Sequence, residues 1–143
     1  MKEENTYRQT IPSSTTGRYT ALTRKAMRIC YAAHEGQMDK SGVPYVFHPI
    51  HLAEQMETEE EICTALLHDV VEDTKWTLKE LEAEGFPTGV LEAVRLLTRE
   101  KDVPYMAYIE RLSGNQIARK VKLADLEHNS DLTRLIEVTE RDL

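Results

Sequence analysis

The chain has 143 residues and a net charge of −7, because 18 lysines and arginines stand against 25 aspartates and glutamates. Its length favours a single domain, and 41% hydrophobic with 30% charged residues is typical of a soluble globular protein. The acidic balance argues against a nucleic-acid polymer as partner, and the lack of a long apolar run argues against a membrane span. A small phosphate ligand held by a metal ion is still compatible with both observations.

The chain begins with a polar stretch that lacks the apolar core of a signal peptide. We therefore expect residues 1–18 to form a loose arm and residues 19–143 to form the domain. The two cysteines, Cys30 and Cys63, fall among apolar helix positions. They are predicted to be small core residues rather than a disulfide or a metal-binding pair, so a reducing cytoplasm is the simplest setting.

Helical patterning starts after the arm. Apolar residues recur at intervals of three and four from Leu22 to Ala33, which predicts an amphipathic helix. Thr20 is expected to cap the start of this helix and Gly36 to end it. Residues 36–47 then form the one substantial loop in the first half of the chain.

Pro49 is expected to open the next helix, which would run to about Met56, and to restrict His48 to an extended backbone. Thr58 and Glu61 have the spacing of a capping box and predict a further helix start. The apolar positions of that helix are Ile62, Ala65, Leu66 and Val70.

The second half of the chain repeats these signals. Thr77 and Glu80 form another capping box, before a short helix that should end near Gly85. Apolar residues from Val90 to Leu97 indicate the next helix.

Asp102 is expected to cap a helix that runs through Leu112 and stops at Gly114, and Asn115 is expected to cap the helix after it. A separate last helix is suggested by Leu132, Leu135 and Ile136. Strand signals are almost absent. The sequence therefore predicts an all-α fold, a compact bundle of about seven or eight short helices.

The segment 66–74 carries His68, Asp69, Glu72 and Asp73. Residues four apart share a face of a helix, so one continuous helix would place His68 above Glu72 and Asp69 above Asp73. Three carboxylates would repel one another there, and a divalent cation would remove the conflict. Imidazole with carboxylate suits manganese, iron or zinc. The alternative is a solvated acidic helix end with one surface histidine.

A second polar cluster lies in segment 120–129. Asp125 follows an apolar stripe and should lie near the core, where carboxylates are normally paired or bound to a metal. Asn129 is four residues later and should point the same way. The alternatives for Asp125 are an N-cap or a salt bridge to a lysine, and His128 is a rival ligand by residue type.

Three other histidines precede these clusters. His48 lies directly before Pro49, at the mouth of a predicted helix. His34 and His51 are weaker candidates for a metal site. His34 could simply complement the dipole at the end of the first helix, and His51 is expected to face solvent or polar neighbours.

These segments, in this order and spacing, resemble the HD-domain metal-dependent phosphohydrolases. The likeness is strongest to the (p)ppGpp hydrolase domain of RelA/SpoT proteins and to small alarmone hydrolases. The resemblance rests on residues 32–37, 40–49, 65–74, 121–125 and 128–129. It extends over about residues 20–135 and implies a stand-alone hydrolase domain without a synthetase.

The resemblance implies a role for each matching residue. The implied metal ligands are His48, His68, Asp69 and Asp125. The metal in this family is usually manganese, and another divalent transition metal could take its place. The reaction removes pyrophosphate from the 3′ position of a small phosphorylated purine nucleotide.

The remaining implied roles concern water and substrate. Glu72 and Asp73 match the acidic pair that positions or activates the attacking water. Asn129 matches an asparagine that contacts the substrate. Lys40 and Ser41 match the loop that meets the nucleotide, although a plain turn before the next glycine would also explain them.

The chain departs from the alarmone hydrolases at a few positions. Asp39 stands where those proteins commonly have an arginine that stacks on the guanine base. Residues 126–127 and 130–132 (Ser130, Asp131 and Leu132) differ as well. Two alternatives therefore stay open: an HD-domain phosphatase for another nucleotide phosphomonoester, and a non-catalytic nucleotide-sensing domain. Tyr105, Met106 and Tyr108 could form a self-association interface, but helix packing would explain these residues equally well.

Overall fold

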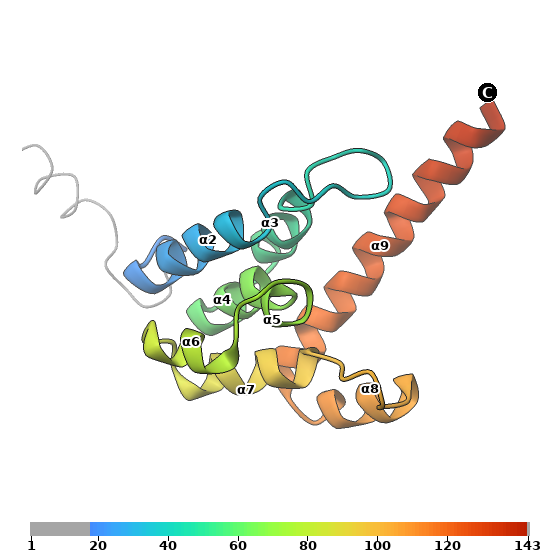
Figure 1. Ribbon diagram of the computed structural model, residues 1–143. Helices are drawn as coiled ribbons and strands as arrows, with labels where there is room; N and C mark the ends of the chain where they lie inside the picture. The colour runs from blue at the N-terminus through green and yellow to red at the C-terminus, as the bar shows by residue number, and fades with distance from the viewer. Residues whose placement is uncertain (1–17, 143) are drawn as a thin grey trace, which may run out of the picture.

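The computed structural model describes the backbone of residues 18–142 and the side chains of residues 18–131 (Figure 1). The predicted arm of residues 1–18 thus lies outside the described residues, apart from Arg18. The helices are α2 (Ala21–Ala33), α3 (Phe47–Glu54), α4 (Glu59–Leu67), α5 (Val70–Asp73), α6 (Leu78–Ala83), α7 (Thr88–Leu97), α8 (Tyr105–Ser113) and α9 (Gln116–Asp142). Residues 18–142 contain no strand beyond one isolated bridge, so the all-α prediction is confirmed.

Across that same part of the chain, no helix combines the length and the apolar character that crossing a membrane would require.

Three helices start at the predicted threonines. The side chains of Thr20, Thr58 and Thr77 each accept a hydrogen bond from the backbone N–H three residues later, and the third residue returns the bond in each case. Gly36 and Gly85 follow the ends of α2 and α6 with φ angles of 82° and 97°. Residues with a side chain rarely adopt such angles, which explains glycine at both positions.

Helix α3 starts earlier than predicted, at Phe47 rather than at Pro49. A turn begins the helix: the N–H of Phe47 donates to the carbonyl of Pro44, and that of His48 to the carbonyl of Tyr45. Pro49 therefore lies in the first helical turn, where its missing N–H costs no intrahelical bond. His48 is helical, and the expectation of an extended backbone was wrong.

The helix predicted to continue through Val70 breaks after Leu67, and α5 follows as a separate turn. His68 explains the break, because its Nδ1 atom lies 2.7 Å from the carbonyl oxygen of Ala65. In a continuous helix that oxygen would accept from the N–H of Asp69. A side chain that bonds to the backbone competes with the helix in this way.

The start of α8 also differs from the prediction. The helix begins at Tyr105 after Pro104, whose fixed φ suits a helix start, and Asp102 makes no cap. Tyr108 is buried and donates its hydroxyl to the carbonyl of Leu97, whereas Tyr105 and Met106 are exposed. Tyr108 is therefore not available for contacts with another molecule. Self-association through Tyr105 and Met106 stays a prediction.

The last helix is longer than expected. Asn115 caps α9 as predicted, since its Oδ1 atom accepts from the N–H of Ala118 at 2.9 Å, and Gly114 ends α8. One continuous helix then spans Gln116–Asp142, so the predicted separate helix was wrong. The segment contains neither proline nor glycine that would interrupt it. The side chains of Leu132, Leu135 and Ile136 lie outside the described residues.

Helix α4 lies at the centre of the domain and packs against α2, α3, α7 and α9 (Figure 1). All its residues from Ile62 to Leu67 are buried. Cys63 in this stretch and Cys30 on α2 are free and buried, and burial raises the pKa of each thiol to about 12. Both cysteines are core residues, as predicted.

Candidate metal centre and active site

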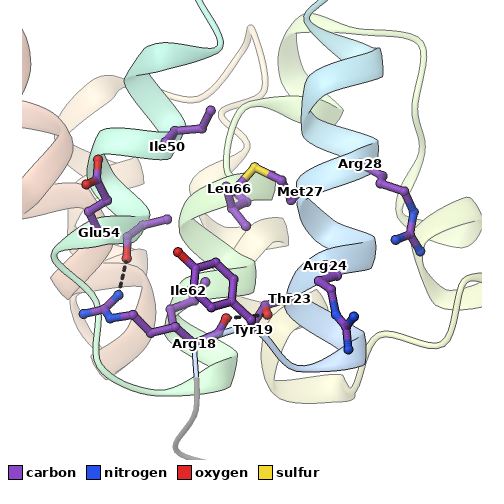
Figure 2. Close-up of a pocket in the computed structure, with 11 residues that line it drawn as sticks. Arg18, Tyr19, Thr23, Arg24, Met27, Arg28, Ile50, Glu54, Ile62 and Leu66 are labelled. Atoms are coloured by element: carbon purple, nitrogen blue, oxygen red, sulfur yellow. Dashed lines mark hydrogen bonds between the residues drawn. The ribbon is translucent and has the colours of Figure 1, made fainter. Parts of the chain in front are cut away.

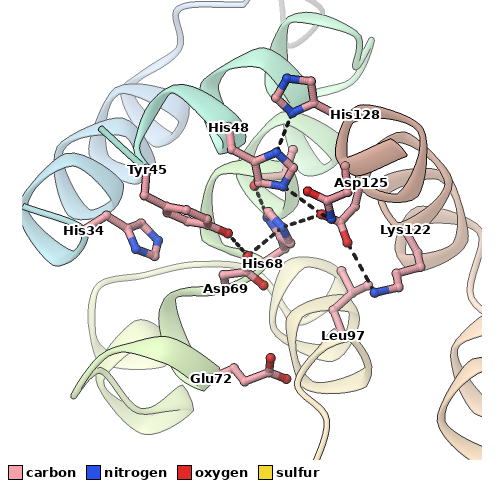
Figure 3. A network of polar contacts seen from close by, with 12 residues as sticks. His34, Tyr45, His48, His68, Asp69, Glu72, Leu97, Lys122, Asp125 and His128 are labelled. Carbon is pink, nitrogen blue, oxygen red and sulfur yellow. Dashed lines mark hydrogen bonds and ion pairs between the residues drawn. The ribbon is translucent and has the colours of Figure 1, made fainter. Parts of the chain in front are cut away.

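Three helices bring His48, His68 and Asp125 together in the interior. His48 comes from the first turn of α3, His68 follows the last turn of α4, and Asp125 lies on α9 (Figure 3). All three are buried, and one ligand atom from each lies within 4.8 Å of the others. Nε2 of His48 is 2.7 Å from Oδ1 of Asp125, and Nε2 of His68 is 3.7 Å from the same oxygen.

His68 provides a test of whether this group suits a cation. Its Nδ1 atom donates to the carbonyl of Ala65, so in the neutral ring Nε2 carries the lone pair. This Nε2 is buried and makes no hydrogen bond of good geometry, although Oδ2 of Asp69 is 3.1 Å away. A buried lone pair that faces two carboxylates lacks a donor, and a divalent ion fits that donor set.

The charged side chains of the cluster shift one another's pKa values. Burial alone would lower the pKa of His68, but Asp69 and Asp125 outweigh burial and raise this pKa to about 10. Burial also acts to raise the pKa of Asp69, yet His68 and Tyr45 lower it to about 2. The hydrogen bond from His48 and the nearby imidazole of His68 likewise outweigh burial at Asp125, and hold its pKa well below the usual range.

Asp125 has two further partners on its own helix. Lys122 donates to Oδ2 and Asn129 donates to Oδ1, each at 3.2 Å. The lysine salt bridge that the sequence left as an alternative therefore exists beside the histidine contacts. Asn129, expected to contact substrate, points toward Asp125 as its spacing predicted. Lys122 also lies over the ring of Tyr108, 5.4 Å from its centroid.

A second group adjoins the first at Asp69. The carboxylate oxygens of Asp69, Glu72 and Asp73 lie within 4.8 Å of one another. Glu72 and Asp73 are exposed, and Glu72 accepts the backbone N–H of Arg99 at 2.6 Å. Partial burial and the neighbouring carboxylates raise the pKa of both residues. The expected gathering of three carboxylates is thus observed, on the single turn of α5 that Asp69 caps, where the N–H of Asp73 donates to the carbonyl of Asp69.

Tyr45 is a site residue that sequence reasoning did not single out. Its hydroxyl donates to Oδ2 of Asp69, and burial together with that carboxylate raises the pKa of the tyrosine (Figure 3). The ring of His34 lies 4.9 Å from that of Tyr45. His34 ends α2 but is buried, with Nδ1 against Gln37, so it does more than complement the helix dipole. Neither contact of Tyr45 has a spacing signal, because Asp69 lies 24 positions later and His34 lies on the far side of an irregular loop.

Lys40 and Ser41 are exposed residues of the turn in this loop. Asp39 shapes the turn: its Oδ1 atom accepts the N–H groups of Ser41 at 2.8 Å and Val43 at 3.0 Å. This is a side-chain-bonded turn. Within the described chain, no hydrogen bond or ion pair links the Lys40 or Ser41 side chain to the histidine–aspartate cluster.

His128 and His51 lie on the outer side of His48. Nδ1 of His128 is 2.6 Å from Nδ1 of His48, so His128 adjoins a candidate ligand rather than the ligand group itself. His51 is exposed, as expected, and its ring stacks on His128. Partial burial and the charges of His48 and His51 lower the pKa of His128, which favours its neutral ring.

A pocket of about 610 Å³ lies elsewhere, between α2, α3 and α4 (Figure 2). Its apolar lining includes Met27, Ile50 and Leu66, and Arg18 and Tyr19 also line it. None of the residues that line it belongs to the two ionisable groups. It is therefore separate from the candidate centre.

No family model matches the chain, but individual proteins do. A Haemophilus influenzae guanosine-3′,5′-bis(diphosphate) 3′-pyrophosphohydrolase is 35% identical over 112 residues, covering 68% of this chain and 16% of the relative. The Escherichia coli K12 bifunctional (p)ppGpp synthase/hydrolase SpoT is 35% identical over 121 residues, which cover 74% of this chain and 17% of the relative. The chain thus spans about one sixth of these bacterial relatives.

A shorter relative matches over most of its length. The Danio rerio guanosine-3′,5′-bis(diphosphate) 3′-pyrophosphohydrolase MESH1 is 36% identical over 130 residues, covering 80% of this chain and 71% of the relative. A solved structure of a metazoan SpoT ortholog that hydrolyses ppGpp superposes with a TM-score of 0.64. That match has 28% identity and covers 75% of this chain and 67% of the other.

The helical fold and the buried histidines and aspartate beside an acidic pair define a domain of the HD type. More narrowly, the chain belongs to the family of guanosine-3′,5′-bis(diphosphate) 3′-pyrophosphohydrolases.

Proposed function

We propose that this chain is a metal-dependent hydrolase that removes the 3′-pyrophosphate from (p)ppGpp or a closely related purine nucleotide. One observation carries the proposal: a buried imidazole nitrogen without a hydrogen-bond partner faces two carboxylates, next to an exposed acidic pair. The printed activities of the relatives give the substrate class. The cytoplasm is the proposed setting, because both cysteines are free thiols.

The proposed metal ligands are His48, His68, Asp69 and Asp125, and the proposed ion is Mn²⁺ or another divalent transition metal. When bound, such an ion lowers the pKa of water and offsets charge on phosphoryl oxygens. The protein contributes fixed ligand directions, because the backbone of α4 holds the His68 ring and α9 holds Asp125. The bonds to these side chains exist before any ligand arrives, which reduces the cost of binding.

Glu72 and Asp73 are proposed to orient the attacking water and accept its proton. Both carboxylates are exposed enough to meet a substrate, and their raised pKa values make them better bases than an isolated surface carboxylate. Asn129 is proposed to contact the substrate beside Asp125, and Lys40 and Ser41 to meet it from the loop. Lys40 would act as a point cation near phosphate.

A specific observation favours a second substrate class. Asp39 is engaged in the turn of its own loop and presents a carboxylate where a base-stacking cation would be needed. A phosphatase for another nucleotide phosphomonoester is therefore the alternative function. It would use the same metal centre and release orthophosphate.

The test is an assay of the purified chain with Mn²⁺ against guanine and adenine nucleotides that carry a 3′-pyrophosphate, with a nucleotide phosphomonoester panel alongside. We expect release of pyrophosphate from ppGpp, abolished by Asp69→Ala. Orthophosphate as the sole product would favour the alternative. A folded protein with no turnover and no response to metal would support a non-catalytic nucleotide-sensing domain.

A further inference from the structure

A row of three imidazole rings runs outward from the buried cluster. Nδ1 of His128 lies 2.6 Å from Nδ1 of His48 (Figure 3). The two ring centroids are 4.9 Å apart and the planes differ by 11°. A nitrogen separation of 2.6 Å is a hydrogen-bond distance and too short for stacked faces, so the rings meet edge to edge. His51 covers the face of His128, with centroids 4.2 Å apart.

This contact constrains the proton of His48. A neutral imidazole carries one proton, and the nitrogen that binds a metal must be the unprotonated one. Nε2 of His48 lies 2.7 Å from a carboxylate oxygen of Asp125, which can only accept, so without an ion this nitrogen carries a proton. Metal binding at Nε2 requires the ring proton to lie on Nδ1 instead. That proton needs an acceptor, and among the described residues His128 Nδ1 is the atom at hydrogen-bond distance.

The other candidate ligand histidine has the same arrangement. Nδ1 of His68 donates to the carbonyl of Ala65 and leaves Nε2 for the ligand group. In His68 the acceptor is the backbone of the preceding helix, whereas in His48 it is a side chain from α9. Partners of this kind fix the tautomer and ring orientation of metal-binding histidines.

We infer that His128 is a positioning residue for the metal centre: its Nδ1 atom accepts the Nδ1 proton of His48 and keeps Nε2 of His48 free for the ion. The inference rests on the proposed metal-dependent hydrolase. In this role His128 is not a metal ligand itself but the hydrogen-bond partner of the proposed ligand His48. His51 supports the arrangement, because its stacking limits rotation of the His128 ring.

Two variants separate the hydrogen bond from the ring. His128→Phe keeps an aromatic ring for His51 to stack on but has no acceptor. His128→Asn loses the ring but places an amide oxygen close to where Nδ1 now lies. We expect Mn²⁺ binding, measured by calorimetry and by the electron paramagnetic resonance of free Mn²⁺, to weaken roughly ten- to hundredfold in the phenylalanine variant. The asparagine variant should recover most of it, and Glu127→Gln, an exposed change on the same helix, should bind like the wild type.

Nitrogen-15 NMR of the histidines, with diamagnetic Zn²⁺ as the probe, gives a readout that is independent of turnover. The wild type should carry the His48 proton on Nδ1, and the phenylalanine variant should lose that single tautomer. Wild-type Mn²⁺ affinity in His128→Phe would overturn the inference, as would equal losses in both variants. If Asp69→Ala binds Mn²⁺ as tightly as the wild type, the metal centre and the inference both fail. If the wild type turns over substrate and His128→Phe binds Mn²⁺ as tightly as the wild type, the role of His128 is wrong but the proposed hydrolase stands.

Discussion

Two groups of ionisable side chains meet at Asp69 and differ in burial and in charge balance. The inner group, His48, His68 and Asp125, is buried, and its carboxylate is matched by imidazoles and by a lysine. The outer group, Asp69, Glu72 and Asp73, is partly or fully exposed and consists of carboxylates alone. The pKa of Asp125 is lowered, whereas the pKa values of Glu72 and Asp73 are raised.

This contrast shows how one site can hold a cation and also move a proton. In the inner group the partners are fixed by α3, α4 and α9, so the carboxylate stays charged and its direction is set. In the outer group, partial burial and repulsion from the neighbouring carboxylates raise the pKa of Glu72 and Asp73, which favours the uptake of a proton there. Each variant below therefore should damage one property more than the other.

The largest expected effect is that of Asp125→Ala, which removes the shared partner of the inner group. Lys122 would then lose its carboxylate partner and His68 would keep only Asp69, and breaking a buried ion pair in this way costs about 3–5 kcal/mol. We expect Mn²⁺-dependent hydrolysis to fall to background and the free energy of unfolding, measured in urea, to drop by that amount. Glu127→Ala, an exposed carboxylate on the same helix, is the matched control. Unchanged stability would show that the inner group is not held by Asp125.

Glu72→Gln should affect the outer group alone. The amide keeps the shape of the side chain and its bond from the Arg99 N–H but cannot accept a proton from water. General-base catalysis contributes about 10²–10⁴-fold, so kcat should fall within this range while the Mn²⁺ affinity stays close to that of the wild type. Glu82→Gln, an exposed change on α6, serves as control. Full activity on the true substrate would contradict the role of Glu72.

The sequence predicted the helices best where side chains bond to their own backbone. The threonine caps of α2, α4 and α6 depend on residues three apart, so local spacing sufficed to find them. The break at His68 was missed because it needs the side chain to bond backward to Ala65, which no spacing rule encodes. The length of α9 was missed because the apolar residues Leu132, Leu135 and Ile136 suggested a separate helix.

In the candidate site, too, the sequence predicted the local contact and missed the contacts between distant residues. The contact of Asp125 with Asn129 follows from helical periodicity, and the structure shows it. The bond from Tyr45 to Asp69 joins residues 24 positions apart, and that between His48 and His128 joins residues 80 apart. Such pairs depend on how helices pack, which residue type and spacing do not determine.

The pH dependence of the metal-free protein should distinguish the groups further. The folded-state pKa of His68 is raised to about 10, above its unfolded value near 6.5, so its stabilisation is complete below pH 6.5 and disappears as the pH rises toward 10. Asp69, lowered to about 2, stabilises above pH 4 and loses this effect as the pH falls toward 2.

Unfolding in urea with a chelator present should therefore show the greatest stability between about pH 4 and 6.5. Above that window stability should decline by at most about 1.4 kcal/mol per pH unit, the value for one proton. Saturating Mn²⁺ should weaken this dependence, because the ion takes the place of the proton. A flat profile from pH 6.5 to 9 without metal would contradict the raised pKa of His68.

The smallest expected effect concerns Tyr45, whose hydroxyl donates to the carboxylate that both groups share. Tyr45→Phe removes one hydrogen bond to a charged group, which is worth about 1.5–3 kcal/mol. The charge of Asp69 would then be less well compensated, so its pKa should rise from about 2 and acid unfolding should begin at a higher pH. Tyr31→Phe changes an exposed hydroxyl on α2 and should leave stability unchanged. Since the inner group keeps all its own partners, Mn²⁺ affinity should fall less in Tyr45→Phe than in His128→Phe. The opposite ranking would place the control of the metal centre in the loop instead of in α9.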